Sequence, residues 1–171
     1  MTKSVLQFPS KSRQPLQWRN TIADILLIGL VSGPVAAPFL AGWNIFPLPL
    51  IASIIYFMGS HVCPQPEMGL MLNSPHLMSV CMRCYGVLLA LVTTRLLFSR
   101  DRGTGFYWLK QYRFQGATIA TILTAAYLFE MLAELWGWWS YNNFTVTLFG
   151  FLTGLGIGLF LTPVVYVRRY P

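Results

Sequence analysis

The sequence predicts an all-α polytopic membrane protein, with four transmembrane helices and one short re-entrant or interfacial helix. Of its 171 residues, 55% are hydrophobic and 10% are charged, and the mean hydropathy is +0.55. Soluble domains carry about 25% charged residues, so an ordinary water-facing surface is not available. The chain also contains long apolar runs, and about 20 apolar residues suffice to cross a bilayer. Basic residues flank these runs, which is typical of the cytosolic segments of membrane proteins.

Each run can be assigned in order along the chain. Residues 1–20 are predicted to form a polar, basic N-terminal arm, and residues 21–171 a single helical membrane domain. The run from Phe46 to Ser60 is short for a crossing and starts among prolines, so we expect it to be re-entrant or interfacial. The spanning helices are expected over residues 21–43, 85–98, 116–138 and 144–167.

Two further features support the later spans. The third spanning run ends in WGWWSY (residues 136–141), an aromatic cluster expected where a helix leaves the bilayer. The last run contains TGLGIG (residues 153–158), whose small residues are expected to let helices approach closely in lipid.

The charge bias predicts the orientation in the membrane. The N-terminal arm, the Arg100–Arg113 loop and the C-terminus are basic and should therefore be cytosolic. Four crossings satisfy this if Phe46–Ser60 does not cross, and residues 61–84 then form an extracytosolic Cys/His loop. We expect a plasma (inner) or internal membrane of a prokaryote, with the lipid bilayer and other membrane proteins as partners. Nucleic acid is not expected, because the net charge of +7 is confined to segments flanking apolar runs.

Residues 61–86 (HVCPQPEMGLMLNSPHLMSVCMRCYG) hold all three cysteines and both histidines of the chain. Three thiolates and one imidazole make a closed tetrahedral site for zinc, with iron as the alternative ion. The C-x-x-C pair can reach one ion from a single turn, and the H-x-C pair can do so from an extended stretch. Prolines and a glycine in the spacer favour a loop that folds back. The predicted ligands are His61, Cys63, Cys81 and Cys84.

Charged residues near the predicted helices suggest supporting contacts. Arg83 lies between two cysteines and can pair with Glu67 in the loop to orient the site. Glu130 and Glu134 are four residues apart and therefore neighbours on one helix face. A polar link from these carboxylates to Arg83 or Arg95 is the expected arrangement. Carboxylates inside a membrane helix can also indicate function.

These observations leave three functions open. The expected class is non-enzymatic: a structural metal site in a protein that acts in the assembly of membrane complexes. The alternative is a membrane thiol–disulfide oxidoreductase that uses Cys81 and Cys84. Such a relay normally needs two cysteine pairs, and Cys63 has no fourth cysteine to pair with. The second alternative is a proton or cation carrier that uses Glu130 and Glu134.

The segments GSHVCPQPE and CMRCYG, together with TGLGIGLFLTP in the last apolar run, resemble a family of membrane proteins known as domain of unknown function 2085. The resemblance covers most of the chain beyond the N-terminal arm and implies a site in the same segment. In place of the family's second histidine, which follows its first cysteine, this chain has Pro64. The family implies no activity. The matching residues are His61, Cys63, Gln65, Glu67, Cys81, Arg83, Cys84 and Gly86.

Overall fold

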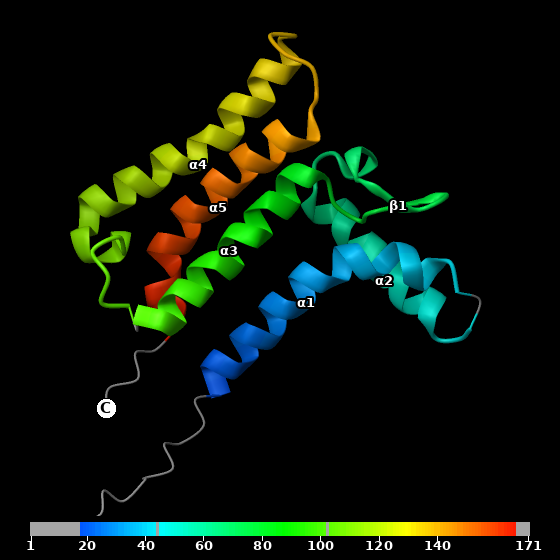
Figure 1. The fold of residues 1–171 in the computed structure, drawn as a ribbon, viewed down its shortest axis with the longest axis horizontal. Coiled ribbons are helices and arrows are strands. Elements are labelled where there is room, and N and C mark those ends of the chain that lie inside the picture. The colour runs from blue at the N-terminus through cyan, green and yellow to red at the C-terminus, as the bar shows by residue number, and fades with distance from the viewer. Residues whose placement is uncertain (1–17, 44, 102, 167–171) are drawn as a thin grey trace, which may run out of the picture.

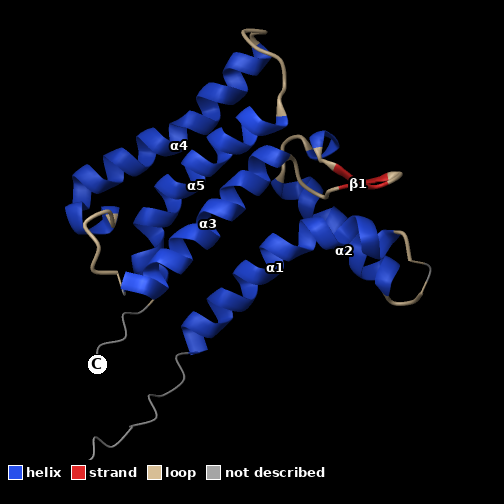
Figure 2. Cartoon of the chain, in the orientation of Figure 1, coloured by secondary structure: helices blue, strands red, loops and turns tan. Residues whose placement is uncertain are grey.

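The computed structural model describes residues 18–43, 45–101 and 103–166, and it is almost entirely helical (Figure 2). Most of the polar arm predicted over residues 1–20 lies outside the described residues. The long helices are α1 (Trp18–Ala41), α3 (Met82–Asp101), α4 (Arg113–Leu135) and α5 (Asn143–Val165). A shorter helix, α2 (Leu48–Val62), lies between α1 and α3 in the chain. Two 3-10 turns cover Pro66–Met68 and Leu109–Tyr112.

The predicted architecture is confirmed. Four of the described helices are long and apolar enough to cross a membrane, and α2 is shorter than a span. The helices α4, α5, α3 and α1 lie side by side in that order, and α2 folds back beside the end of α1 (Figure 1). The start of α1, the end of α3, the start of α4 and the end of α5 lie at one end of this bundle. The cysteine segment lies at the opposite end, which we call the loop end.

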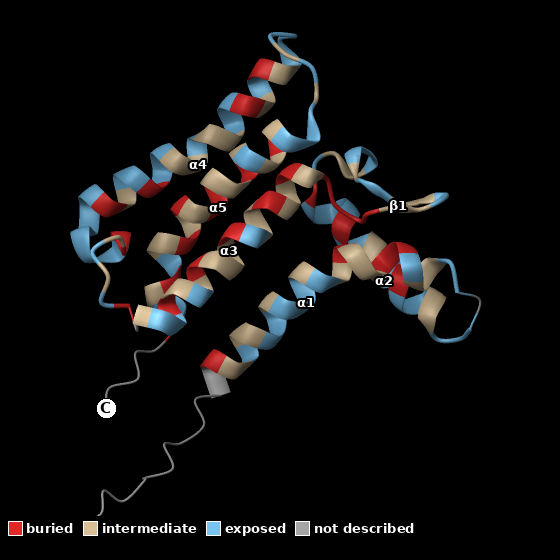
Figure 3. Ribbon diagram, viewed as in Figure 1, coloured by how far each residue is buried: buried red, intermediate tan, exposed pale blue. Residues whose placement is uncertain are grey.

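The helices expose apolar side chains, as lipid contact requires. In α1, one face is especially open: Ile25, Leu26 and Ile28 are 64%, 62% and 66% exposed. Figure 3 shows buried residues along both α3 and α5, and Gly86 and Thr94 of α3 lie against Thr147 and Gly158 of α5. The core therefore lies between α3 and α5, and the outer helices present their apolar faces to lipid.

Close packing of α3 against α5 depends on glycine at two positions near the loop end. A Cβ at Gly86 would collide with the carbonyl oxygen of Thr147, and one at Gly150 with the carbonyl oxygen of Arg83. The same holds further along, where Gly154 lies against the backbone of Val87. The predicted use of small residues for helix contact is confirmed.

The loop between α2 and α3 contains a feature that the sequence did not predict. Two short antiparallel strands, β1 (Met71–Asn73) and β2 (His76–Leu77), form a small hairpin. The Tyr56 hydroxyl of α2 donates a hydrogen bond to the carbonyl of Leu77 at 2.6 Å. This bond holds the returning strand against α2, so the chain re-enters α3 next to the point where it left α2.

A second interhelical contact ties α1 to α3 deeper in the bundle. The guanidinium of Arg95 donates two hydrogen bonds to the Asp24 carboxylate, at 2.6 and 2.7 Å. Its central carbon lies 4.3 Å from the centroid of the Tyr166 ring. An ion pair between these two mainly apolar helices fixes the register of α1 against α3.

Candidate functional site

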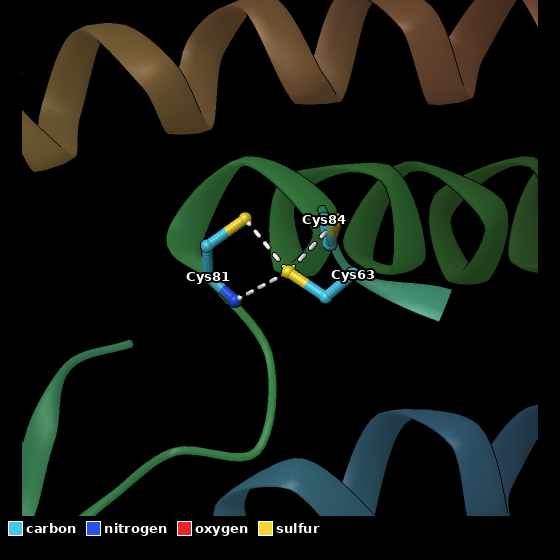
Figure 4. A group of neighbouring side chains, drawn as sticks. All are labelled: Cys63, Cys81 and Cys84. Atoms are coloured by element: carbon cyan, nitrogen blue, oxygen red, sulfur yellow. Dashed lines mark hydrogen bonds between the residues drawn. The ribbon is translucent and has the colours of Figure 1, made fainter. Parts of the chain in front are cut away.

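Three sulfur atoms meet at the loop end of the bundle (Figure 4). Cys63 ends α2, Cys81 directly precedes α3, and Cys84 lies in the first turn of α3. The Sγ of Cys63 lies 3.2 Å from the Sγ of Cys81 and 3.6 Å from that of Cys84. All three sulfurs lie within 4.8 Å of one another. Cys63 and Cys81 are 3% and 0% exposed and therefore screened from solvent, whereas Cys84 is partly buried. We call these residues the thiol group.

Local backbone geometry explains why the three residues converge. The chain leaves α2 at Cys63 in an extended conformation, with φ −92° and ψ 126°. After the hairpin it returns so closely that a Cβ at Gly59 would collide with the carbonyl oxygen of Ser79. The N–H of Cys81 then donates a hydrogen bond to the Cys63 sulfur at 3.2 Å. A glycine in α2 is therefore what allows the two halves of the thiol group to approach.

The hydrogen bonds within the group make its members electrostatically unequal. The Cys63 sulfur accepts hydrogen bonds from the Cys84 thiol and from the N–H of Cys81, and the Cys63 thiol donates to the Cys81 sulfur. The side-chain hydrogen bond with Cys81, as the largest cause, and the one with Cys84 hold the pKa of Cys63 below that of an ordinary thiol. The side-chain hydrogen bond with Cys63, together with burial, raises the pKa of Cys81. Cys63 is therefore the member that most readily carries the thiolate charge.

His61 does not join the thiol group. Its ring is exposed, its Nδ1 lies 2.7 Å from the carbonyl oxygen of Phe57, and it packs on the Phe57 ring with centroids 4.3 Å apart. The physical reason is that α2 continues to Val62, so His61 is helical and not in an extended stretch. Residues two apart in a helix do not share a face. The structure thus brings together three of the four predicted ligands and leaves the imidazole aside.

Directly beside the thiol group lies a buried ion cluster centred on Arg83. Its guanidinium forms an ion pair with Glu130 and another with Glu134. The Nη2 donates to the two carboxylates at 3.0 and 2.6 Å. Nη1 donates to the side-chain oxygen of Gln65 at 2.8 Å. The side chains of Arg83 and Glu130 are both 0% exposed.

This cluster decides between the contacts that the sequence suggested. The predicted polar link from Glu130 and Glu134 is confirmed, with Arg83 as the partner. Arg95 instead pairs with Asp24. The predicted pairing of Arg83 with Glu67 is wrong, because all of the guanidinium contacts above go to Gln65 and the two α4 carboxylates. A hydrophobic bundle favours this outcome, since a buried arginine needs charge compensation within reach.

Sequence reasoning gave no role to Gln65 and missed Tyr127. The Tyr127 hydroxyl lies 3.9 Å from the sulfur of Cys84, and its ring centroid lies 5.6 Å from the guanidinium carbon of Arg83. Tyr127 therefore touches both the thiol group and the ion cluster. A signal existed in the spacing: Tyr127, Glu130 and Glu134 lie three and four residues apart, which places them on one face of α4.

The geometry permits two kinds of chemistry. Three sulfurs at these separations suit a thiophilic ion such as zinc, which is bound by cysteine thiolates. Because the His61 ring does not point to the three sulfurs, such an ion would have three protein ligands and one coordination position left open. The same closeness of sulfurs also suits thiol–disulfide exchange, which proceeds by attack of one thiolate on a neighbouring sulfur.

Comparison with known proteins yields one match. A family model described as "Predicted membrane protein (DUF2085)" matches residues 63–160. The matched region contains all three cysteines, Arg83 and both of its carboxylate partners. No curated protein and no solved structure matches the chain.

Proposed function

The chain belongs to the DUF2085 family of predicted membrane proteins, and from this premise we propose that Cys63, Cys81 and Cys84 hold a thiophilic metal ion, zinc in the first place, in a multi-pass protein with an assembly role. Iron is the alternative ion. The observation that carries the proposal is the convergence of three sulfurs within 4.8 Å from two separate segments. Thiolates are the preferred soft ligands for these ions.

An ion in this position would cross-link two separate segments of the chain. It would join the end of α2 to the start of α3 and thereby close the loop of residues 64–80. The ion cluster joins the start of α3 to α4 through buried ion pairs. Together the two sites would make the loop end a rigid surface in a molecule whose sides meet lipid. A rigid surface at the membrane boundary is what a protein needs to hold other membrane proteins in place.

The missing imidazole also fits an assembly role. Zinc prefers four ligands in structural sites, and the thiol group supplies three. The fourth position can be filled by water or by a donor atom of a partner protein. If a partner protein supplied the fourth ligand, the bound metal would form part of the partner's binding site, and metal binding and partner binding would be coupled.

Purified protein should carry close to one zinc ion per chain, which elemental analysis after isolation in mild detergent will measure. Cys81→Ser removes one of the three sulfurs and should abolish most of the bound metal. His61→Ala is the matched control, because the imidazole lies outside the thiol group, and it should keep the metal. Unchanged metal content in Cys81→Ser would contradict the proposal, and loss in His61→Ala would instead restore the histidine as a ligand.

The second candidate is a thiol–disulfide oxidoreductase, and the separation of 3.2 Å between the Cys63 and Cys81 sulfurs favours it. All three thiols are free, so a pair can become a disulfide by exchange with a substrate disulfide, which is reduced to two thiols, and the third thiolate can then attack the new bond. The metal analysis separates the two candidates when thiols are titrated in the same sample. Metal-free protein with one disulfide among the three cysteines would support the oxidoreductase and contradict the metal site.

The carrier function is disfavoured by the ion cluster. Glu130 is completely buried, and both carboxylates are occupied by Arg83. A carboxylate that must pick up and release cations cannot at the same time offset a buried guanidinium. We therefore treat Glu130 and Glu134 as structural partners.

We propose that both termini are cytosolic and that the thiol group is extracytosolic. The basic residues Lys110 and Arg113 lie at or just before the start of α4. Figure 1 shows that the start of α4, the start of α1 and the end of α5 lie at the same end of the bundle. The positive-inside bias then orients that end to the cytosol. A green fluorescent protein fused to the C-terminus should therefore fluoresce, and an alkaline phosphatase fused there should be inactive. The reverse pair of results would contradict this orientation.

A further inference from the structure

An apolar cavity of about 250 Å³ lies beside the thiol group, between α1, α2 and α3. Its walls come from three helices: Leu30 and Pro34 of α1, Ile55 and Gly59 of α2, and Val87 and Leu88 of α3. Cys84 of the thiol group also lines it. None of the described lining residues is charged, so the cavity excludes a phosphate or an ammonium headgroup, which would lose its hydration without compensation.

The cavity wall contains a buried hydroxyl group without a hydrogen-bond partner among the described residues. Ser79 is 2% exposed and lines the cavity, and its hydroxyl has no hydrogen-bond partner among the described residues. A buried hydroxyl without a partner costs roughly 1–3 kcal/mol, so such groups are rare unless something binds there. Ser79 also lines a neighbouring, more polar hollow beside Tyr56 and Met78. It is the residue at which an apolar ligand could receive a hydrogen bond.

Size and chemistry together restrict the ligand. An apolar cavity of about 150 Å³ accommodates benzene, so about 250 Å³ accommodates a substituted six-membered ring. The walls suit an uncharged, flat, lipophilic body, and the Ser79 hydroxyl suits a carbonyl oxygen. We propose that this cavity binds an uncharged lipophilic ring that carries a carbonyl, of the quinone class, with Ser79 donating a hydrogen bond to that oxygen.

The position of the cavity suits a compound that arrives through the bilayer. Two of its three walls belong to α1 and α2, which expose apolar side chains along much of their length. The proposal does not require an ion in the thiol group: Cys84 is the one proposed metal ligand in the cavity lining, and Ser79 and the walls from α1 and α2 contain none.

The test uses the full-length protein in nanodiscs and an azido-substituted decyl-benzoquinone as photoreactive probe. Labelling should be saturable, should be competed by unlabelled decyl-benzoquinone, and should map to peptides that contain the cavity walls. Ile55→Trp fills the cavity and should reduce labelling at least tenfold, an estimate that rests on steric exclusion from a well-packed site. Ile54→Trp is the matched control: Ile54 is 52% exposed on the same helix and outside the cavity lining, so labelling should persist.

Two further variants protect the test against a folding failure of Ile55→Trp. Leu30→Trp fills the cavity from the α1 wall and should have the same effect. Ser79→Ala should raise the Kd for the quinone probe about five-fold, the size expected for one hydrogen bond. Ser53→Ala should leave this Kd unchanged, because the Ser53 hydroxyl already donates to the Pro49 carbonyl within α2. Labelling that survives both tryptophan variants would overturn the proposal. So would equal competition by decane, which has neither a ring nor a carbonyl, because it would identify the occupant as an ordinary hydrocarbon chain.

Discussion

Replacing Arg83 with methionine should lower the free energy of unfolding by about 3–5 kcal/mol, the cost of leaving a buried charge without its partner. Glu130 is completely buried and Glu134 is 17% exposed, and both rely on this guanidinium. Their two carboxylates would remain in an apolar environment with no cation beside them. The loss should appear as a lower melting temperature in detergent and as lower abundance in membranes.

Two companion variants show whether charge is the cause. Combining Arg83→Met with Glu130→Gln and Glu134→Gln removes both unpaired charges and should recover most of the lost stability. Arg95→Met breaks the other interhelical ion pair, but Arg95 and Asp24 are 22% and 35% exposed, so its effect should be smaller. If Arg83→Met melts like the wild type, the ion cluster does not stabilise the bundle and this interpretation is wrong.

The second large effect is expected at Gly150. A Cβ at this position would strike the carbonyl oxygen of Arg83, and a backbone atom cannot move aside as a flexible side chain can. Gly150→Ala should therefore push α5 away from α3 and cost about 3 kcal/mol, the upper part of the usual range for overpacking. It should also loosen the ion cluster, because the collision falls on the residue at its centre. Thermal unfolding in detergent measures the first effect.

Gly29→Ala provides the control for the change of residue type itself. A Cβ at Gly29 in α1 would meet nothing within 4 Å. Alanine is a better helix former than glycine by about 1 kcal/mol, so this variant should be neutral or slightly more stable. Similar losses at both positions would mean that the effect does not come from the α3–α5 contact.

Metal content measured in Gly150→Ala would connect the two parts of the site. Cys81 and Cys84 lie on either side of Arg83, and the carbonyl of Arg83 is the group that Gly150 touches. Displacement of that turn would move two of the three sulfurs relative to Cys63. We therefore expect weaker retention of metal as well as lower stability, whereas Gly29→Ala should retain it.

The sequence alone was enough for the number and type of helices and for the place of the thiol group. Apolar runs of spanning length have few alternatives to helix in lipid, because each backbone N–H and C=O must bond within its own segment. Three cysteines confined to residues 63–84 cannot lie far apart once the chain between them folds back. The pairing of the α4 carboxylates with an arginine was predictable for a similar reason, since buried charges of opposite sign must find each other.

The tertiary structure decided which side chains actually meet. Whether His61 joins the sulfurs depends on where α2 ends, and a helix that continues to Val62 turns the imidazole to Phe57. The choice of Glu130 and Glu134 over Glu67 depends on which helix packs beside the start of α3. Gln65, Tyr127 and the Ser79 cavity likewise arise from segments distant in sequence. Local composition sets which segments enter the membrane, whereas the geometry of their contacts, set by glycines and ion pairs between helices, determines the site.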